Sequence, residues 1–119
     1  MIILNLTQHD STPEQQLGGV VEPKDKVAVR SLLTFTTIPS KGEVAERAEK
    51  LADAAFHADA EAAMIGGAPY LMSALECALK AKGIKPLYAF SVRESADVTQ
   101  PDGSVRKVAV FRHAGFVEV

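Results

Sequence analysis

The sequence predicts one Rossmann-like α/β domain with a mostly parallel sheet of four to five strands, flanking helices and a C-terminal antiparallel hairpin. Three observations support this fold class. Short apolar segments alternate along the chain with longer segments of helical periodicity. Most of the helical segments begin with a recognisable capping signal. The last two apolar segments are joined by a turn at residues 101–103, which is too short for the crossover that parallel strands require.

Length and composition limit the possible classes of protein. The 119 residues correspond to a single domain, residues 1–119. The single cysteine, Cys77, agrees with a reducing compartment. No basic leader and no long apolar run is visible, so we expect a cytoplasmic protein without membrane contact. The formal net charge of −2 does not provide the basic surface that duplex nucleic acids require.

The first predicted elements are a strand and a short helix. Residues 2–6 form a short apolar run that is typical of a buried strand. Thr12 is the expected N-cap of the following helix, with Pro13 at its first position and Gln15 at its third. The two glycines at residues 18–19 then end this helix.

The next segments predict a helix, a short strand and a longer helix. Residues 24–33 have helical character, and residues 33–38 have the β-branched and aromatic content of a strand, although a turn before the following proline would look the same. Ser40 and Glu43 predict a capping box for a helix that extends to about Ala58. Small apolar residues line one narrow face of this helix, as expected for packing on a sheet: Val44, Ala48, Leu51, Ala52 and Ala55.

The second half of the chain predicts a strand, a helix and a hairpin. Residues 61–65 form a strand that ends at two glycines, and Pro69 begins a helix that ends at Gly83 after a basic last turn. Residues 87–92 predict a central strand, apolar on both faces. Residues 105–111 predict the returning strand of the hairpin, antiparallel at the edge of the sheet.

The carboxyl ends of the strands are the expected place for a ligand, because open parallel sheets bind ligands in the crevice at that edge. The candidate ligand-binding residues are Thr7 and Gln8 after the first strand, Gly66, Gly67, Ala68 and Tyr70 after the third, and Ser91 and Arg93 after the fourth. His9 is the candidate catalytic residue, since an imidazole at a strand end could act as a general acid or base. A surface loop histidine without a role is the alternative.

The segment from Gly66 to Tyr70 favours an anionic ligand. Glycines let a ligand approach the backbone, and the first N–H groups of the next helix carry positive partial charge, so a phosphate is the natural guest. The planar guanidinium of Arg93 could hold the same group. The segment matches neither a Walker A motif nor a complete dinucleotide fingerprint. A plain strand-to-helix turn, with Arg93 in a surface ion pair, is the alternative. The three histidines lack metal-binding spacing, so we expect no metal and no cofactor.

Three segments carry a resemblance to a known family. Asn5-Leu6-Thr7-Gln8-His9, Thr12-Pro13-Glu14-Gln15 and Ile65-Gly66-Gly67-Ala68-Pro69 resemble the small single-domain relatives of the CRISPR-associated Rossmann-fold (CARF) proteins. The resemblance in layout spans most of the chain. It implies a homodimer that binds cyclic oligoadenylate across the dimer at the strand ends, in antiviral defence. It assigns residues 7–9 to the first-strand loop of the site and residues 66–70 to the turn that holds the ligand. The sequence carries no decisive catalytic signature, and another small nucleotide-binding or mobile-element protein could share the layout.

Three functions are compatible with these features. The first is binding of a nucleotide or other phosphorylated ligand, such as cyclic oligoadenylate, at the carboxyl ends of the strands. The second is a metal-independent phosphodiesterase that cleaves this ligand, with His9 as acid or base and Arg93 stabilising the developing charge. The third is a small partner-binding protein without a ligand, which an exposed apolar surface around Phe111 and Phe116 would favour.

Overall fold

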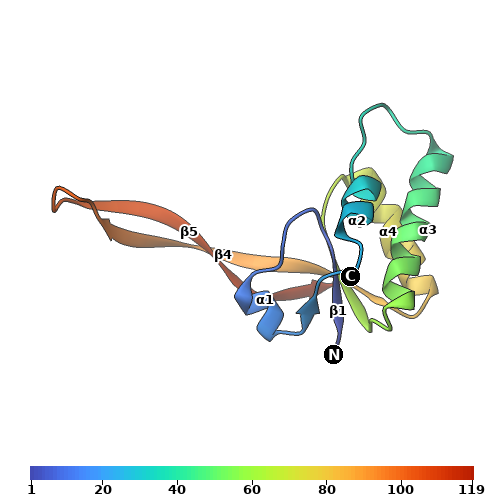
Figure 1. The fold of residues 1–119 in the computed structure, drawn as a ribbon, viewed down its shortest axis with the longest axis horizontal. Coiled ribbons are helices and arrows are strands. Elements are labelled where there is room, and N and C mark those ends of the chain that lie inside the picture. The colour runs from blue at the N-terminus through green and yellow to red at the C-terminus, as the bar shows by residue number, and fades with distance from the viewer.

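The computed structural model describes residues 1–119 as a body of sheet and helices from which one long two-stranded arm extends (Figure 1). The molecule measures 56 × 35 × 25 Å along its principal axes, and the arm accounts for the longest of them. No helix of the chain has the length and apolar character needed to cross a bilayer. The elements in chain order are β1 (Ile3–Leu6), α1 (Pro13–Leu17), β2 (Val20–Val21), α2 (Lys26–Leu33), α3 (Lys41–His57), β3 (Ala62–Ile65), α4 (Pro69–Ala81), β4 (Lys85–Thr99) and β5 (Val105–Glu118).

The five strands form one sheet in the order β2-β1-β3-β4-β5. The first four are parallel to their neighbours, and β5 is antiparallel to β4. This arrangement confirms the predicted fold class, a mostly parallel sheet with flanking helices and a C-terminal antiparallel hairpin. Because β2 and β3 lie on opposite sides of β1, the chain connections leave β1 and β3 in opposite directions. Such a reversal opens a crevice at the carboxyl ends of the two strands.

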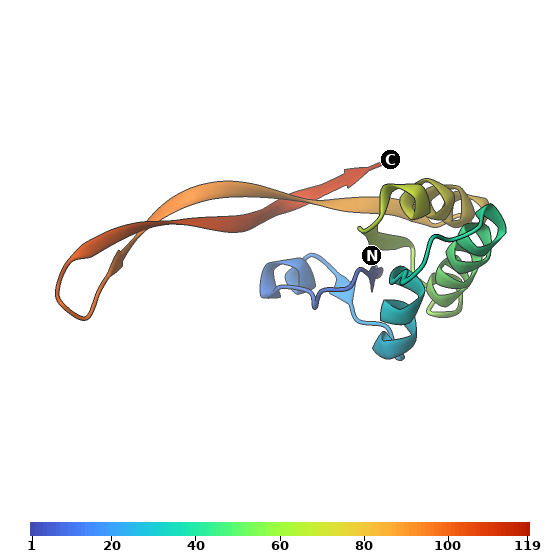
Figure 2. The same cartoon turned by 90° about the horizontal axis from the view of Figure 1, so that it is seen from above.

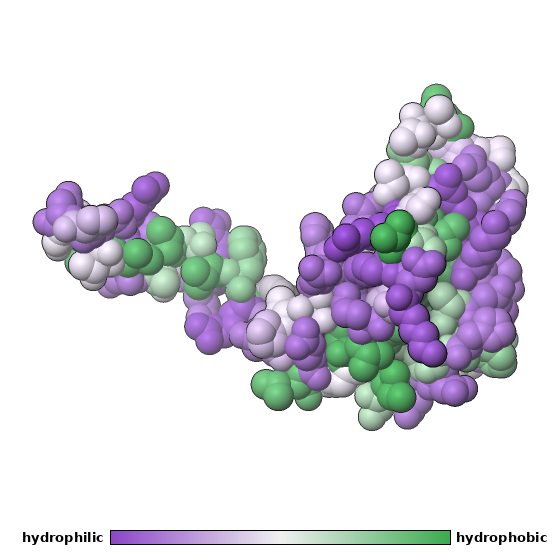
Figure 3. All heavy atoms as spheres, in the orientation of Figure 1, coloured by the Kyte–Doolittle hydropathy of each residue, from purple (hydrophilic) through white to green (hydrophobic).

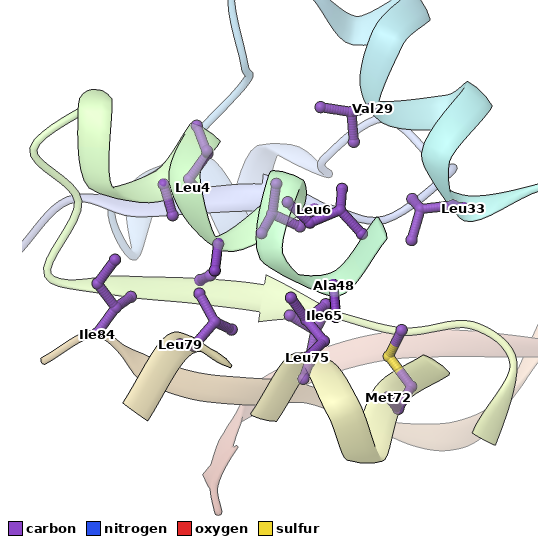
Figure 4. Packing of buried hydrophobic residues seen from close by; sticks show 14 of the residues in the cluster. Leu4, Leu6, Val29, Leu33, Ala48, Ile65, Met72, Leu75, Leu79 and Ile84 are labelled. Atoms are coloured by element: carbon purple, nitrogen blue, oxygen red, sulfur yellow. The ribbon is translucent and has the colours of Figure 1, made fainter. Parts of the chain in front are cut away.

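Helices α2, α3 and α4 pack on one face of the sheet, where sixteen buried residues form the main core (Figure 4). Leu4 and Leu6 of β1 point to this side, and they belong to the same cluster as Leu75 and Leu79 of α4. The small residues predicted to line α3 are mostly buried here, which lets the helix approach closely. A second cluster of five buried residues lies on the opposite face, packed by Phe116: Ile3, Val20, Ala62, Met64 and Leu87.

The predicted capping signals at two helices are confirmed, one of them in part. At α1, the hydroxyl of Thr12 accepts from the amide of Gln15 and the Gln15 side chain accepts from the amide of Thr12, a complete capping box. At α3, the hydroxyl of Ser40 accepts from the amide of Glu43 at 3.1 Å. The carboxylate of Glu43 does not accept from the backbone amide of Ser40, because it pairs with Arg47, one turn later, at 2.9 Å.

The predicted strand at residues 33–38 is wrong. Leu33 ends α2, and the residues after it form a loop. The ring of Phe35 packs edge-on against Tyr70 at 5.4 Å between centroids, and the guanidinium of Arg47 lies over it at 4.2 Å. The second strand is instead the two-residue β2, which pairs with β1 directly after the double glycine.

The prediction of a central strand at residues 87–92, apolar on both faces, is correct only at its start. β4 does lie inside the sheet order, but β3 pairs with residues 85–87 alone, because β3 is four residues long. Beyond them Phe90 and Val92 are exposed. β4 and β5 continue together as the arm, with a bulge between Phe90 and Ser91, so the returning strand is also longer than the predicted residues 105–111.

Candidate functional site

A cavity of about 570 Å³ lies at the carboxyl ends of β1 and β3, where the chain connections diverge. Its volume falls within the range of small-molecule sites. Four segments contribute: the loop after β1, the start of α1, the end of β3 with its glycines, and the beginning of β4. The lining residues are Thr7, Gln8, His9, Asp10, Thr12, Gln15, Met64, Ile65, Gly66, Gly67, Tyr88 and Ala89.

The loop after β1 is held by Asn5, a fully buried polar residue in an otherwise apolar strand. Its amide group donates to the carbonyl of His9 at 2.8 Å and to the carboxylate of Glu22 at 2.8 Å. Its side-chain oxygen accepts from the amide of Thr7 at 3.0 Å and from the Thr7 hydroxyl at 2.6 Å. Since buried polar groups are costly unless they are paired, Asn5 fixes the turn of this loop.

Lys26 and Glu22 support the same loop from the segment after β2. The ammonium of Lys26 donates to the carbonyls of Thr7 and His9 at 3.0 and 3.1 Å and lies 3.0 Å from the Glu22 carboxylate. Burial raises the pKa of Glu22, but hydrogen bonds from Asn5, Lys26 and Ser11 outweigh it and leave that pKa below its usual value. Glu22 is therefore held as a carboxylate under the loop.

Helix α2 completes the support with Arg30. Its guanidinium donates to the carbonyl of Gln8 at 3.1 Å and to the carboxylate of Asp10 at 3.2 Å. The Gln8 side chain in turn donates to the carbonyl of Leu33 at 3.3 Å and to the hydroxyl of Thr34 at 3.2 Å. The side chain of Gln8, like the hydroxyl of Thr7, is thus occupied inside the protein.

The backbone amides around the cavity remain available. The carbonyls of Thr7, Gln8 and His9 all accept from side chains of β1 or α2, whereas the N–H groups of Gln8, His9 and Asp10 donate to no group of the chain. The N–H group of Gly67, across the cavity, is equally free. The loops therefore present donors, and an anion is the chemically matching ligand.

The two glycines have different backbone requirements. Gly67 has φ of 151°, a conformation that L residues rarely adopt. Gly66 has an ordinary backbone, and a methyl group added there would lie 3.7 Å from the Thr7 side chain, in normal van der Waals contact. Gly67 is therefore required by the backbone, and Gly66 leaves space in the cavity.

Tyr88 is a cavity residue that sequence reasoning missed. Its hydroxyl donates to the carboxylate of Glu76 at 2.6 Å. Burial, with the hydrogen bond and the charge of Glu76, raises the pKa of Tyr88 to about 12, so the phenol stays protonated. Its position in the strand after β3 is the signal that could have found it, because β4 is the neighbour of β3 at the same edge. Asp10, Thr12 and Gln15 also line the cavity without having been predicted as site residues. Asp10 follows His9 directly, and Thr12 and Gln15 are the predicted capping residues of α1.

The predicted site residues divide into two groups. Thr7, Gln8, His9, Gly66 and Gly67 line the one cavity. The imidazole of the candidate catalytic His9 is exposed there and makes no hydrogen bond within the chain.

The other four predicted residues lie outside the cavity lining. Ala68 is the N-cap of α4 and packs against the main core. Tyr70 packs against the ring of Phe35 and is not among the lining residues. Ser91 and Arg93 lie on the arm, and Arg93 is opposite Phe111 of β5. The lining therefore contains neither lysine nor arginine, and no cluster of three or more His, Cys, Asp or Glu side chains is suited to a metal ion.

Comparison with known proteins gives a family but no activity. No curated protein and no solved structure matches the chain. One family model, described as the Uncharacterized protein MJ1673 family, matches residues 1–117, almost the whole chain. The chain belongs to this MJ1673 family.

Proposed function

We propose that the chain binds a nucleotide or other phosphorylated ligand in the cavity at the carboxyl ends of β1 and β3. The observation that carries the proposal is the set of unpaired backbone amides at Gln8, His9, Asp10 and Gly67, four residues that line a cavity where the chain connections diverge. Phosphate oxygens accept such bonds, and neighbouring amides in a concave turn form an anion site without a charged side chain.

Size and composition of the cavity support the same ligand class. A volume of about 570 Å³ accommodates a mononucleotide unit. The lining also includes the apolar residues Met64, Ile65 and Ala89, of which Ala89 is exposed. The resemblance to CARF proteins makes cyclic oligoadenylate the first ligand to test. A homodimeric assembly, a cytoplasmic location and a role in CRISPR-associated antiviral defence belong to this proposal.

A second candidate is metal-independent cleavage of a phosphodiester in the same cavity. One observation favours it: the imidazole of His9 is free and lies beside the unpaired amides. Such an imidazole could take a proton from an attacking hydroxyl while the amides stabilise the charge on the phosphoryl oxygens. The charge-stabilising part that the sequence assigned to Arg93 would then be carried by the amides of the same chain.

Thermal unfolding in the presence of AMP, ATP and cyclic oligoadenylates tests the binding. A bound ligand at a hundredfold excess over its Kd stabilises the fold by about 2.7 kcal/mol. Gly66→Leu fills the cavity beside Thr7 and should abolish this gain while leaving the unliganded protein folded. Gly42→Leu, at an open position on α3, is the matched control and should respond like the wild type. A panel without any stabilisation, or a full response from Gly66→Leu, would contradict the proposal.

Incubation of wild type and His9→Ala with labelled cyclic oligoadenylate separates the two candidate functions. Cleavage by the wild type that is lost in His9→Ala, with binding retained, supports the phosphodiesterase. Binding without cleavage in both proteins leaves ligand binding as the function. Equal cleavage by both proteins would rule out His9 as the acid or base.

A further inference from the structure

We infer that the arm, residues 91–112 of β4 and β5, is a self-association surface on which two copies of this chain pack face to face. The contact is made by one side of the arm, called here the valine face: Val92, Ala96, Val98, Val108 and Val110. This inference gives a surface to the homodimer of the proposed function, and it does not require the cavity to bind a ligand.

The strand register defines the valine face. Residues directly opposite each other in an antiparallel pair project to the same side. Ala96 pairs with Val108, Glu94 with Val110 and Val98 with Arg106, so apolar side chains dominate this side. The opposite side of the arm carries the polar residues Arg93, Ser95, Asp97, Thr99 and Lys107. It also carries Ala109 and the exposed Val105 and Phe111, so fewer of its positions are apolar than on the valine face.

Nothing in the chain covers the valine face. Val92 and Val98 are 37% and 42% exposed, the other three residues of the face are half-buried within the ribbon, and neither core cluster contains a residue of the arm. Figures 1 and 2 show both strands leaving the body without a helix beside them, and Figure 3 shows hydrophobic side chains gathered along the arm. A two-stranded ribbon is only marginally stable in water unless a further layer packs on it. The arm therefore needs a partner.

The charges on the valine face fit a second copy of the same chain. Glu94 lies two residues from Ala96, toward the body. Arg106, which is opposite Val98, lies two residues from Val108, toward the tip of the arm. A two-fold axis that passes midway between Ala96 and Val108 and crosses the strands obliquely sets Glu94 of each copy over the partner's Arg106, because these residues lie on different strands at equal distances from that pair. Arg106 has no ion pair within its own chain, and Glu94 has only Arg112 at 3.0 Å.

The net charge of the arm argues against nucleic acid as the partner. Double-stranded nucleic acids are bound by an excess of basic groups. The arm has almost balanced charge instead, with basic Arg93, Arg106, Lys107 and Arg112 and acidic Glu94, Asp97 and Asp102. A neutral, self-complementary face is the character expected of an interface between identical subunits.

The size of the face predicts a weak dimer. From Ser91 to Thr99 the ribbon is ~30 Å long and ~10 Å wide, given ~3.4 Å per residue and ~4.8 Å between strands. Its flat area of ~300 Å² is well below the ~800 Å² that each partner contributes to a standard interface. We therefore expect a dimer that forms and dissociates with concentration.

Light scattering of the full chain after size exclusion, from micromolar to near-millimolar concentration, tests the association. The wild type should shift from the mass of one 12.7 kDa chain to twice that mass. Val108→Asp places a charge on the valine face and should abolish the shift. Ala109→Asp, the next residue on the opposite face, should keep it. A wild type that is monomeric throughout, or equal behaviour of the two variants, would overturn the inference, and circular dichroism checks that both remain folded.

A second pair of variants tests the two-fold arrangement. Arg106→Glu repels Glu94 of the other copy and should weaken the dimer at least tenfold, whereas Lys107→Glu on the polar face should change it little. Equal weakening by both would show that the arms do not meet through the valine face. Ligand-induced stabilisation is measured separately. Ligand binding without a dimer would overturn only the inference about the arm. A dimer without ligand binding would overturn only the proposed function of the cavity.

Discussion

At the scale of single residues, the sequence was sufficient to predict which edge of the sheet holds the candidate site, but not which residues support its loops. Thr7, Gln8 and His9 meet Gly66 and Gly67 because the carboxyl ends of parallel strands share an edge, and this follows from the sequence. The sequence assigned ligand contacts to the first two side chains, which instead bond inside the protein. Their partners come from segments up to 26 residues away, and such pairings depend on tertiary structure.

The first prediction concerns the buried Asn5. Asn5→Ala removes one donor each from the Glu22 carboxylate and the His9 carbonyl and leaves the Thr7 amide without its acceptor, so we expect a loss of about 1–3 kcal/mol in the free energy of unfolding. Urea denaturation measures it. Gln8→Ala removes longer hydrogen bonds at an exposed position and is the control, with an expected loss below about 0.5 kcal/mol. An Asn5→Ala protein as stable as wild type would show that the loop does not depend on Asn5.

The second prediction concerns the charge of Glu22. Because its pKa is lowered in the folded protein, the carboxylate contributes stability that is fully present above pH 4.5 and is lost as the pH falls through the lowered pKa. Wild type should therefore exceed Glu22→Gln in free energy of unfolding at pH 7, and the difference should shrink in acid. Urea denaturation at a series of pH values measures it. Glu46→Gln, which loses only an exposed pair with Lys50, should show no such trend. A constant difference down to pH 3 would argue against the carboxylate.

The third prediction compares the two glycines of the site. Gly67→Ala forces an L residue into φ of 151° and should cost about 1–3 kcal/mol. Gly66→Ala adds only an ordinary contact with Thr7 and should change stability by less than about 0.5 kcal/mol. Denaturant unfolding of both variants measures the difference. Similar losses in the two proteins would mean that crowding, rather than backbone conformation, limits this turn.

At the scale of elements, the ends of helices were predictable and the short strands were not. Caps and prolines at Thr12, Ser40 and Pro69 act through local hydrogen bonds and fixed φ angles, so they mark helix starts without knowledge of the fold. Strand propensity instead reports how a side chain fits a half-buried surface. Residues 33–38 have that propensity without a neighbouring strand, whereas the two-residue β2 pairs with β1 despite a weak signal.

The fourth prediction tests the cap of α3. Ser40→Ala removes the acceptor for the Glu43 amide and should lower the free energy of unfolding by about 1 kcal/mol. Ser73→Ala, at an exposed position inside α4, replaces a weaker helix former by a better one and should not destabilise. Thermal or urea denaturation compares them. Equal stability of Ser40→Ala and wild type would mean that tertiary packing alone fixes the start of α3.

At the scale of the whole molecule, the chain divides into a body with all of the core and an arm with none of it. The hairpin itself was predictable from its turn and its alternating residues. Its departure from the body was not, because alternation indicates one polar face without indicating what packs on the other. The short length of β3 determines where the hairpin leaves the body, since β4 has no parallel neighbour after Leu87.

The fifth prediction removes the arm. Replacing residues 93–111 by Asn-Gly joins Val92 to Arg112, which are paired in the ribbon, through a two-residue turn suited to a hairpin. All cavity-lining and core residues remain, so the shortened chain should unfold cooperatively, with a free energy within about 1 kcal/mol of wild type, and should keep any ligand-induced stabilisation. Its mass should stay that of a monomer at every concentration. A shortened chain that still dimerises would move the interface to the body, and one that loses cooperative unfolding would show that the core depends on the arm.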